Sequence, residues 1–351
     1  MNEPKSSRYH RLTRRAGLAS LAITVLVLAA MVPVRPPLPV AAYAALLVLL
    51  VEIAALPLTL YRYRLERRYE LSSQTLPDAL KDQGKGLALA LALAVAGAVV
   101  VYRLIAVSPA WWWLMAATLG AVVTLVLARL APVLLLPLFY RFTPLDRPGL
   151  SARLIELSRR AGVPVLGVYV WGLGAKTRRA NAALVGAGGT RRILLSDTML
   201  AEYSDDEIEV ILAHELAHHA HGDIPKAIAL EYALLLAAGW VASAVLNASW
   251  APLGLAGPAD PAGLPVLVLG AGAVMLASAP LVNAFSRANE RRADAFALAL
   301  TRRGEAFVSA MRRLGQQNLV EENPSRTTVW LFHSHPPLEE RIARAEGTLD
   351  R

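Results

Sequence analysis

The chain has 351 residues, of which 55% are hydrophobic and 18% charged, and its formal net charge is +9. This composition is too apolar for an ordinary soluble domain, and the basic residues flank apolar runs, which indicates membrane anchoring and not nucleic-acid binding. The sequence contains no cysteine, so disulfides and thiolate ligands are excluded, and any metal must be held by His, Asp or Glu.

Several apolar runs are long enough to cross a hydrocarbon core about 30 Å thick. They cover residues 16–34, 40–60, 87–105, 111–139, 227–247 and 264–285. The first run follows a basic segment, so we expect an uncleaved anchor, although a cleaved signal peptide would look similar. The fourth run is longer than one span needs and contains Arg129 and two prolines. It is either a single span or a span followed by a re-entrant stretch.

Charged residues in the connections predict how the spans are oriented. Residues 61–86 are rich in Lys and Arg, whereas residues 106–110 and 248–263 contain neither. Because basic loops stay on the cytoplasmic side, both termini and both polar regions are expected in the cytoplasm. Four parts follow: an N-terminal membrane region of about four spans (1–139), a cytoplasmic catalytic region (140–226), two further spans (227–285) and C-terminal cytoplasmic helices (286–351).

The Ala-, Leu- and Arg-rich composition suggests a multi-pass protein of a bacterial cytoplasmic membrane, in contact with the lipid bilayer. Two charged residues, Glu52 and Arg129, lie within apolar runs. Charges at membrane depth pair with one another or line a polar cavity. The sequence therefore predicts either a Glu52–Arg pair inside the bundle or a wet intramembrane chamber.

The polar regions have the periodicity of helices and short strands. We expect a helix over 149–162, a strand over 164–170, a hairpin of strands over 178–185 and 191–195, and C-terminal helices over about 287–302, 305–317 and 338–345. Ser204 and Glu207 form the pattern of a capping box, which predicts a helix from there to about Gly222. The predicted fold is a multi-span α-helical membrane protein with a cytoplasmic α+β domain.

The helix that begins at Ser204 carries His-Glu-Leu-Ala-His at positions 214–218, an HExxH motif. Residues four apart share one face of a helix, so His214 and His218 can offer two imidazole nitrogens to one Zn²⁺. Glu215 lies one step round the helix, in position for a general base. The motif also occurs by chance in solvated helices, so a metal site requires a third ligand.

The acids downstream of the motif are few, and they are the candidates for the third ligand. The metzincin extension is absent, because its positions are occupied by His221 and Ile224. Asp223 is too close along the chain to bend back comfortably, and Glu231 lies in the next apolar run and points away. Asp260 is expected on the far side of the membrane.

Glu290 and Asp294 remain, one helical turn apart and just after the last span. We expect Glu290 to ligate zinc, with one ion per chain. Asp294 is then placed to accept a hydrogen bond from the outer nitrogen of a ligand histidine, as supporting carboxylates do in metal sites. The alternative is an exposed charged helix.

Several motifs resemble one family. Residues 286–294 (SRANERRAD) resemble the S-R-x-x-E-x-x-A-D motif of the integral-membrane zinc metallopeptidases of type I CAAX prenyl endopeptidase and the bacterial heat-shock membrane protease. Residues 181–186 (NAALVG), 196–198 (SDT), 206–208 (DEI), 335–337 (HPP) and 340–342 (ERI) resemble further signatures of that family. The resemblance covers nearly the whole chain.

The resemblance implies a gluzincin-like zinc peptidase in which His214, His218 and Glu290 bind zinc and Glu215 is the base. It further implies that Asp294 supports a ligand.

The same resemblance implies how a substrate is bound. Asn181 and Ala182, at the start of a strand, would pair with the backbone of a peptide or membrane-protein substrate by strand addition. His335 would donate a hydrogen bond to the substrate carbonyl or to the oxyanion. Arg341 would have a structural or electrostatic role.

The sequence therefore predicts a membrane-embedded zinc endopeptidase. One alternative is an intramembrane protease of the site-two type, but the acidic start of the HExxH helix and the absence of an N-P-D-G loop argue against it. The other is a non-catalytic membrane scaffold with a structural zinc site. The natural substrate and the oligomeric state are left open.

Overall fold

The computed structural model describes residues 4–186 and 188–349. Within them, 6 helices are long and apolar enough to cross a membrane, which confirms the six predicted runs. Their bounds are α1 (Lys5–Met31), α2 (Val40–Arg68), α3 (Leu76–Val107), α4 (Trp112–Leu134), α9 (Asp223–Ser249) and α10 (Leu264–Thr301). Several extend well beyond the apolar runs, because Lys, Arg and Glu are good helix formers and a helix propagates easily once nucleated.

The run over 111–139 is divided in the structure. Its candidate span is Trp112–Leu130. After α4 ends at Leu134, the four-residue helix α5 (Leu136–Phe139) leads into the first strand. Of the two possibilities that the sequence left open, the structure has a span followed by a separate short segment.

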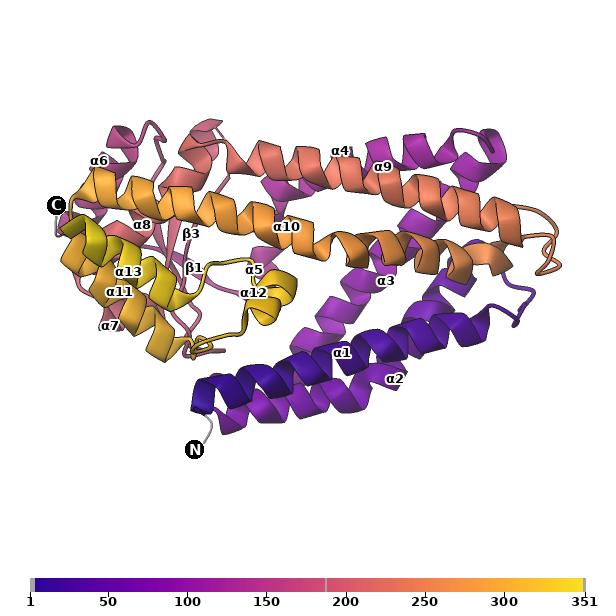
Figure 1. The fold of residues 1–351 in the computed structure, drawn as a ribbon, viewed down its shortest axis with the longest axis horizontal. Helices are drawn as coiled ribbons and strands as arrows, with labels where there is room; N and C mark the ends of the chain where they lie inside the picture. Colours follow the sequence, from indigo (N-terminus) through magenta and orange to yellow (C-terminus); the bar gives the residue numbers. More distant parts are fainter. Residues whose placement is uncertain (1–3, 187, 350–351) are drawn as a thin grey trace.

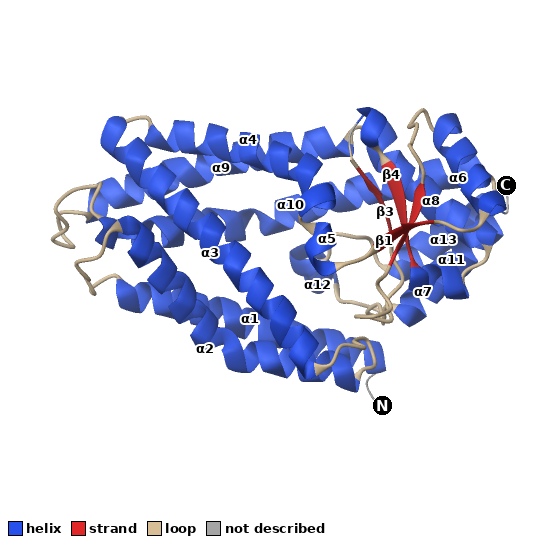
Figure 2. Ribbon diagram, turned by 180° about the vertical axis from the view of Figure 1, so that it is seen from behind, coloured by secondary structure: helices blue, strands red, loops and turns tan. Residues whose placement is uncertain are grey.

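Helices α4, α9 and α10 run along one side of the molecule and α1 and α2 along the other, α3 slants between the two groups, and the strands gather at one end (Figure 1). Helix α9 packs along α10 and against α4, while α2 packs against both α1 and α3. Seen from behind, the strands and the C-terminal helices form a separate body at the end of α10 (Figure 2). The structure therefore joins an α-helical membrane part to an α+β part.

The α+β part contains a four-stranded sheet in the order β1-β2-β4-β3. The strands are β1 (Phe142–Pro144), β2 (Val168–Trp171), β3 (Ala182–Val185) and β4 (Arg192–Ser196). Strands β2 and β4 are parallel, and the other two pairs are antiparallel. The predicted hairpin is confirmed by β3 and β4, and β3 lies at one edge of this sheet.

Helix α8 (Asp205–Ala220) carries the HExxH motif and crosses the core of this part. The predicted capping box is present, because Ser204 accepts from the Glu207 amide and Glu207 accepts from the Ser204 amide. Ile208, Leu212 and Leu216 of α8 are fully buried. The remaining helices are α6 (Pro148–Arg160), α7 (Asp197–Glu202), α11 (Gly304–Gln317), α12 (Arg326–Phe332) and α13 (Leu338–Leu349), with short 3₁₀ segments at Gly188–Thr190 and Pro261–Gly263.

The last span and the helix expected from about 287 are one continuous helix, α10. The sequence suggested a break near 286, but no glycine or proline follows Pro280 within the helix, and the charged residues there have good helix propensity. Glu290 and Asp294 are therefore carried on the same rigid element that crosses the membrane part. This continuity holds them in a constant position relative to α9.

Candidate active site

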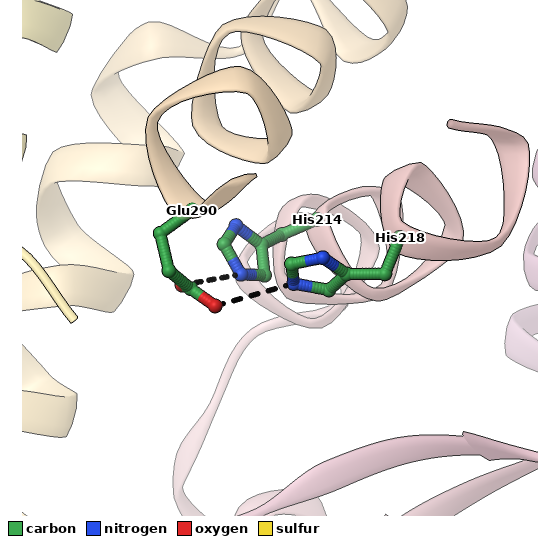
Figure 3. A group of neighbouring side chains, drawn as sticks. All are labelled: His214, His218 and Glu290. Carbon is green, nitrogen blue, oxygen red and sulfur yellow. Dashed lines mark ion pairs between the residues drawn. The ribbon is translucent and has the colours of Figure 1, made fainter. Parts of the chain in front are cut away.

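The two histidines of the HExxH motif and Glu290 meet where α10 crosses α8. The Nε2 atom of His214 lies 3.2 Å from Oε2 of Glu290, and the Nε2 atom of His218 lies 3.4 Å from Oε1. Figure 3 shows both rings directing these nitrogens at the one carboxylate. One ligand atom from each of the three residues lies within 4.8 Å of the others.

These donors suit a metal ion. Oε2 of Glu290 is buried without a hydrogen bond. A buried carboxylate oxygen in that state is costly unless a cation compensates it. Two imidazoles and one carboxylate, with no thiolate, are a known ligand set for catalytic zinc, which keeps a fourth position open. The residues present therefore fit a zinc ion.

Asp294 orients His214. Its Oδ1 accepts from Nδ1 of His214 at 2.9 Å, which leaves Nε2 of that ring to face Glu290. Arg341 of α13 donates to both oxygens of Asp294, at 2.9 and 2.6 Å. A bidentate arginine restricts a carboxylate geometrically. Arg341 thus belongs to the support of the site, as the family resemblance implied.

Asp223 orients His218, a role that the sequence patterns did not predict. Its Oδ2 accepts from Nδ1 of His218 at 3.0 Å. The contact depends on Gly222, whose φ of 64° turns the chain sharply between α8 and α9. Its proximity to the motif along the chain argues against Asp223 as a ligand, but that same proximity lets it contact the outer nitrogen of His218. The useful signal was an acid directly after the glycine that ends the HExxH helix.

The carboxylates make the site attract positive charge. Burial alone lowers the pKa of His214, but the hydrogen bond with Asp294 and the neighbouring carboxylate of Glu290 outweigh it and raise the pKa to about 9. Burial likewise lowers the pKa of His218, and hydrogen bonds with Glu290 and Asp223 again raise it overall. Protons therefore compete with a metal ion for these rings.

Glu215 lies beside the two histidines on α8 and is only partly buried. Burial raises the pKa of its carboxyl, while the charges of His214 and His218 act in the opposite direction. A carboxylate whose pKa is shifted toward neutrality accepts and returns a proton more readily. Its position and its electrostatics both suit a general base.

His335 reaches the same group from the loop between α12 and α13. Its Nε2 lies 3.4 Å from Oε1 of Glu290, and its side chain is 60% exposed. Arg287 of α10 holds the loop by donating to the carbonyls of Val329 and His333, at 2.9 and 2.6 Å. The structure thus places His335 at the open side of the cluster, where a bound peptide could reach it.

Strand β3 lies next to α8, with its free edge turned away from β4. The backbone of Asn181 is already engaged, because its carbonyl accepts from the Ser196 amide and its amide donates to the Ser196 hydroxyl. The alternation of an antiparallel ladder then directs the backbone groups of Ala182 and Leu184 to the free edge. His219 lies beside this edge, with Nε2 3.3 Å from the Leu184 carbonyl.

The structure bears on two expectations about charged residues in the spans. Of the two alternatives for Glu52, the pairing with an arginine is not found among the described residues, and Glu52 instead accepts a hydrogen bond from Gln83 at 3.2 Å. It borders a largely apolar cavity of about 570 Å³ among the long helices. Glu231 does not point away from the site, since it lines a pocket together with His218 and Glu290. The surroundings of Glu52 and Glu231 depend on how separate helices pack together. The local sequence around each residue does not specify that packing.

Comparison with known proteins identifies the family. Residues 144–349 match the model of peptidase family M48. The chain belongs to peptidase family M48. Residues 18–141 match the model described as CAAX prenyl protease N-terminal, five membrane helices. This M48 protein is therefore a membrane metalloprotease that hydrolyses peptide bonds, and the scaffold and site-two alternatives are set aside.

Individual relatives agree. The M48 chain is 31% identical over 303 residues to the uncharacterized metalloprotease YhfN of Bacillus subtilis, with 85% of this chain and 71% of that protein covered. It is 28% identical over 170 residues to CAAX prenyl protease 1 of Saccharomyces cerevisiae, covering 46% of this chain but only 36% of that protein. The crystal structure of S. mikatae Ste24p has the same fold, with a TM-score of 0.85, 21% identity, and coverage of 97% and 88%.

Proposed function

We propose that this M48 metalloprotease is a zinc-dependent endopeptidase, with one zinc ion per chain held by His214, His218 and Glu290. The observation that carries the proposal is the convergence of these three donors on one point. The orphaned, buried Oε2 of Glu290 supports it. Asp294 and Asp223 would each hold one ligand histidine in the tautomer whose Nε2 faces the ion.

A bound zinc ion supplies positive charge that acidifies a water and polarises the scissile carbonyl. Glu215 accepts the proton of the attacking water and then passes it to the leaving amine. His335 donates a hydrogen bond to the carbonyl oxygen as negative charge develops there. Arg341 keeps Asp294, and through it His214, in a fixed orientation during both proton transfers.

The substrate is a peptide or a membrane protein in an extended conformation. Its backbone would add to the free edge of β3 and pair with Ala182. Asn181 would contribute its exposed side chain, because its backbone is engaged by Ser196. Strand addition binds the substrate through its backbone, whatever its sequence. Preference for particular substrate side chains must therefore come from neighbouring pockets.

We further propose that the four regions predicted from the sequence are functional units, with the catalytic and C-terminal regions on the cytoplasmic side of a bacterial plasma membrane. The charge distribution supports this orientation, since residues 61–86 are basic and residues 106–110 and 248–263 carry no Lys or Arg. The zinc site would then act on the cytoplasmic ends of substrates. Cysteine labelling of single-cysteine variants from either side tests the orientation, because the natural chain contains no cysteine.

The decisive experiment compares the wild type with Glu215→Gln in detergent. Bound zinc is measured in both, together with cleavage of an unfolded membrane protein. We expect equal zinc and a loss of cleavage by at least roughly 100-fold in the variant, the size of a typical general-base contribution. Equal cleavage by the two proteins would refute the role of Glu215, and wild type without stoichiometric zinc would refute the site.

A further inference from the structure

A pocket of about 500 Å³ opens directly from the proposed zinc site and runs between α9 and α10. The residues that line it recur with helical spacing on the facing sides of the two helices, so it follows their axes into the membrane part. His218 and Glu290 line one end. A group that enters this pocket is therefore attached to a substrate residue close to the scissile bond.

Most of the wall is apolar, with side chains such as Leu230, Leu234 and Phe285. Two acids of α9 line the pocket: Asp223 at its zinc-site end, and Glu231 farther along, which accepts a hydrogen bond from Thr124 of α4 at 3.0 Å. Among the described residues that line the pocket, none is Lys or Arg. The other acids there have cationic or imidazole neighbours, since Asp223 contacts Arg292 and His218 and Glu290 faces the histidines.

Glu231 is thus a carboxylate in a membrane-spanning helix without a basic partner in its pocket. An ionisable group at that depth is costly unless a partner of opposite charge compensates it. The hydroxyl of Thr124 supplies one neutral hydrogen bond, which is weaker than a charged one. A cation would compensate the carboxylate of Glu231. Such a cation can reach Glu231 from the zinc site through the open pocket.

The length of the pocket restricts which cation fits. Glu231 follows Asp223 by eight residues on α9, which corresponds to about 12 Å along the axis at about 1.5 Å per residue. Helical side chains lean toward the N-terminus of their helix, and the N-terminus of α9 is at the zinc site. That lean shortens the distance from the zinc site to the carboxylate of Glu231. A side chain with a long apolar stem and a cationic end matches the apolar wall of the pocket and the carboxylate of Glu231, and Lys and Arg have that form.

We propose that Glu231 is a specificity-determining residue, and that this pocket binds a lysine or arginine side chain of the substrate next to the scissile bond. The inference rests on the proposed function, because it takes the zinc site as the place of cleavage. It assigns the substrate a chemical class that strand addition alone does not select. Glu231 contacts the substrate cation and takes no part in the proton transfers.

The test uses the zinc-loaded full-length protein in detergent and a randomised synthetic peptide library whose cleavage sites are read by mass spectrometry. Wild type should enrich Lys and Arg at one position flanking the cleaved bond. Glu231→Gln, which is close in shape, should lower that enrichment by roughly tenfold to a hundredfold, the value of a hydrogen bond to a charged group. Glu52→Gln is the matched control, since Glu52 is an acid in another span that borders a different cavity.

A second measurement uses one cleaved peptide and its copy with norleucine in place of the basic residue. Glu231→Gln should lower kcat/KM for the basic peptide and leave the norleucine peptide within a factor of about two. Wild type that cleaves without basic preference, or Glu231→Gln that keeps it, overturns the pocket assignment and leaves the proposed function standing. Wild type that holds zinc and cleaves nothing in the library overturns both.

Discussion

Replacing Asp223 with alanine should weaken zinc binding by roughly 10- to 100-fold, or about 1.4–2.7 kcal/mol. Asp223 is 5% exposed, and its carboxylate accepts from Nδ1 of His218 at 3.0 Å. Without it, the ring of His218 is free to rotate and its tautomer is no longer selected. The ligand set itself stays intact, so the loss is smaller than for a missing ligand.

The assay is competition for zinc between the detergent-solubilised protein and a fluorescent chelator at neutral pH. Arg292→Ala is the control, because Arg292 also contacts Asp223, at 3.1 Å, but its side chain is 49% exposed. An exposed ion pair contributes about 0–1 kcal/mol, so this control should lose no more than about fivefold in affinity. If Asp223→Ala folds normally and binds zinc as tightly as the control, the orienting role of Asp223 is refuted.

Three further changes test other parts of the structure. The hydrogen bond from Arg153 holds the pKa of Asp206 below its usual range. The ionised Asp206 therefore stabilises the folded protein fully above about pH 4, and this contribution is lost as the pH falls further. Thermal unfolding at a series of pH values should show a loss of stability at low pH, and Asp206→Asn should make that loss smaller. Gly222→Ala forces alanine to adopt a φ of 64°, so it should destabilise the protein by about 1–2 kcal/mol in denaturant unfolding and weaken zinc binding. Ala182→Pro removes an amide from the free edge of β3, so zinc content should persist while peptide cleavage falls at least roughly tenfold; undiminished cleavage would contradict strand addition.

Local patterns predicted the elements on which the candidate site is built. Long apolar runs predicted the six spans, because a bilayer sets a minimum helix length. The capping box at Ser204 predicted where α8 begins, since it depends only on residues three apart. The spacing of His214 and His218 predicted that they share a face, because four residues are close to one helical turn. These features are properties of neighbouring residues, and they survive packing unchanged.

Only the tertiary structure decided which distant groups surround the candidate zinc site. That Glu290 faces both histidines follows from the crossing of α8 and α10, and the continuity of α10 through residue 286 was not visible in its composition. The sharp turn at Gly222 brings Asp223 back to His218, and the packing of α9 against α4 and α10 turns Glu231 into the pocket. Such contacts depend on the relative placement of whole helices, which residue spacing along one chain segment does not encode.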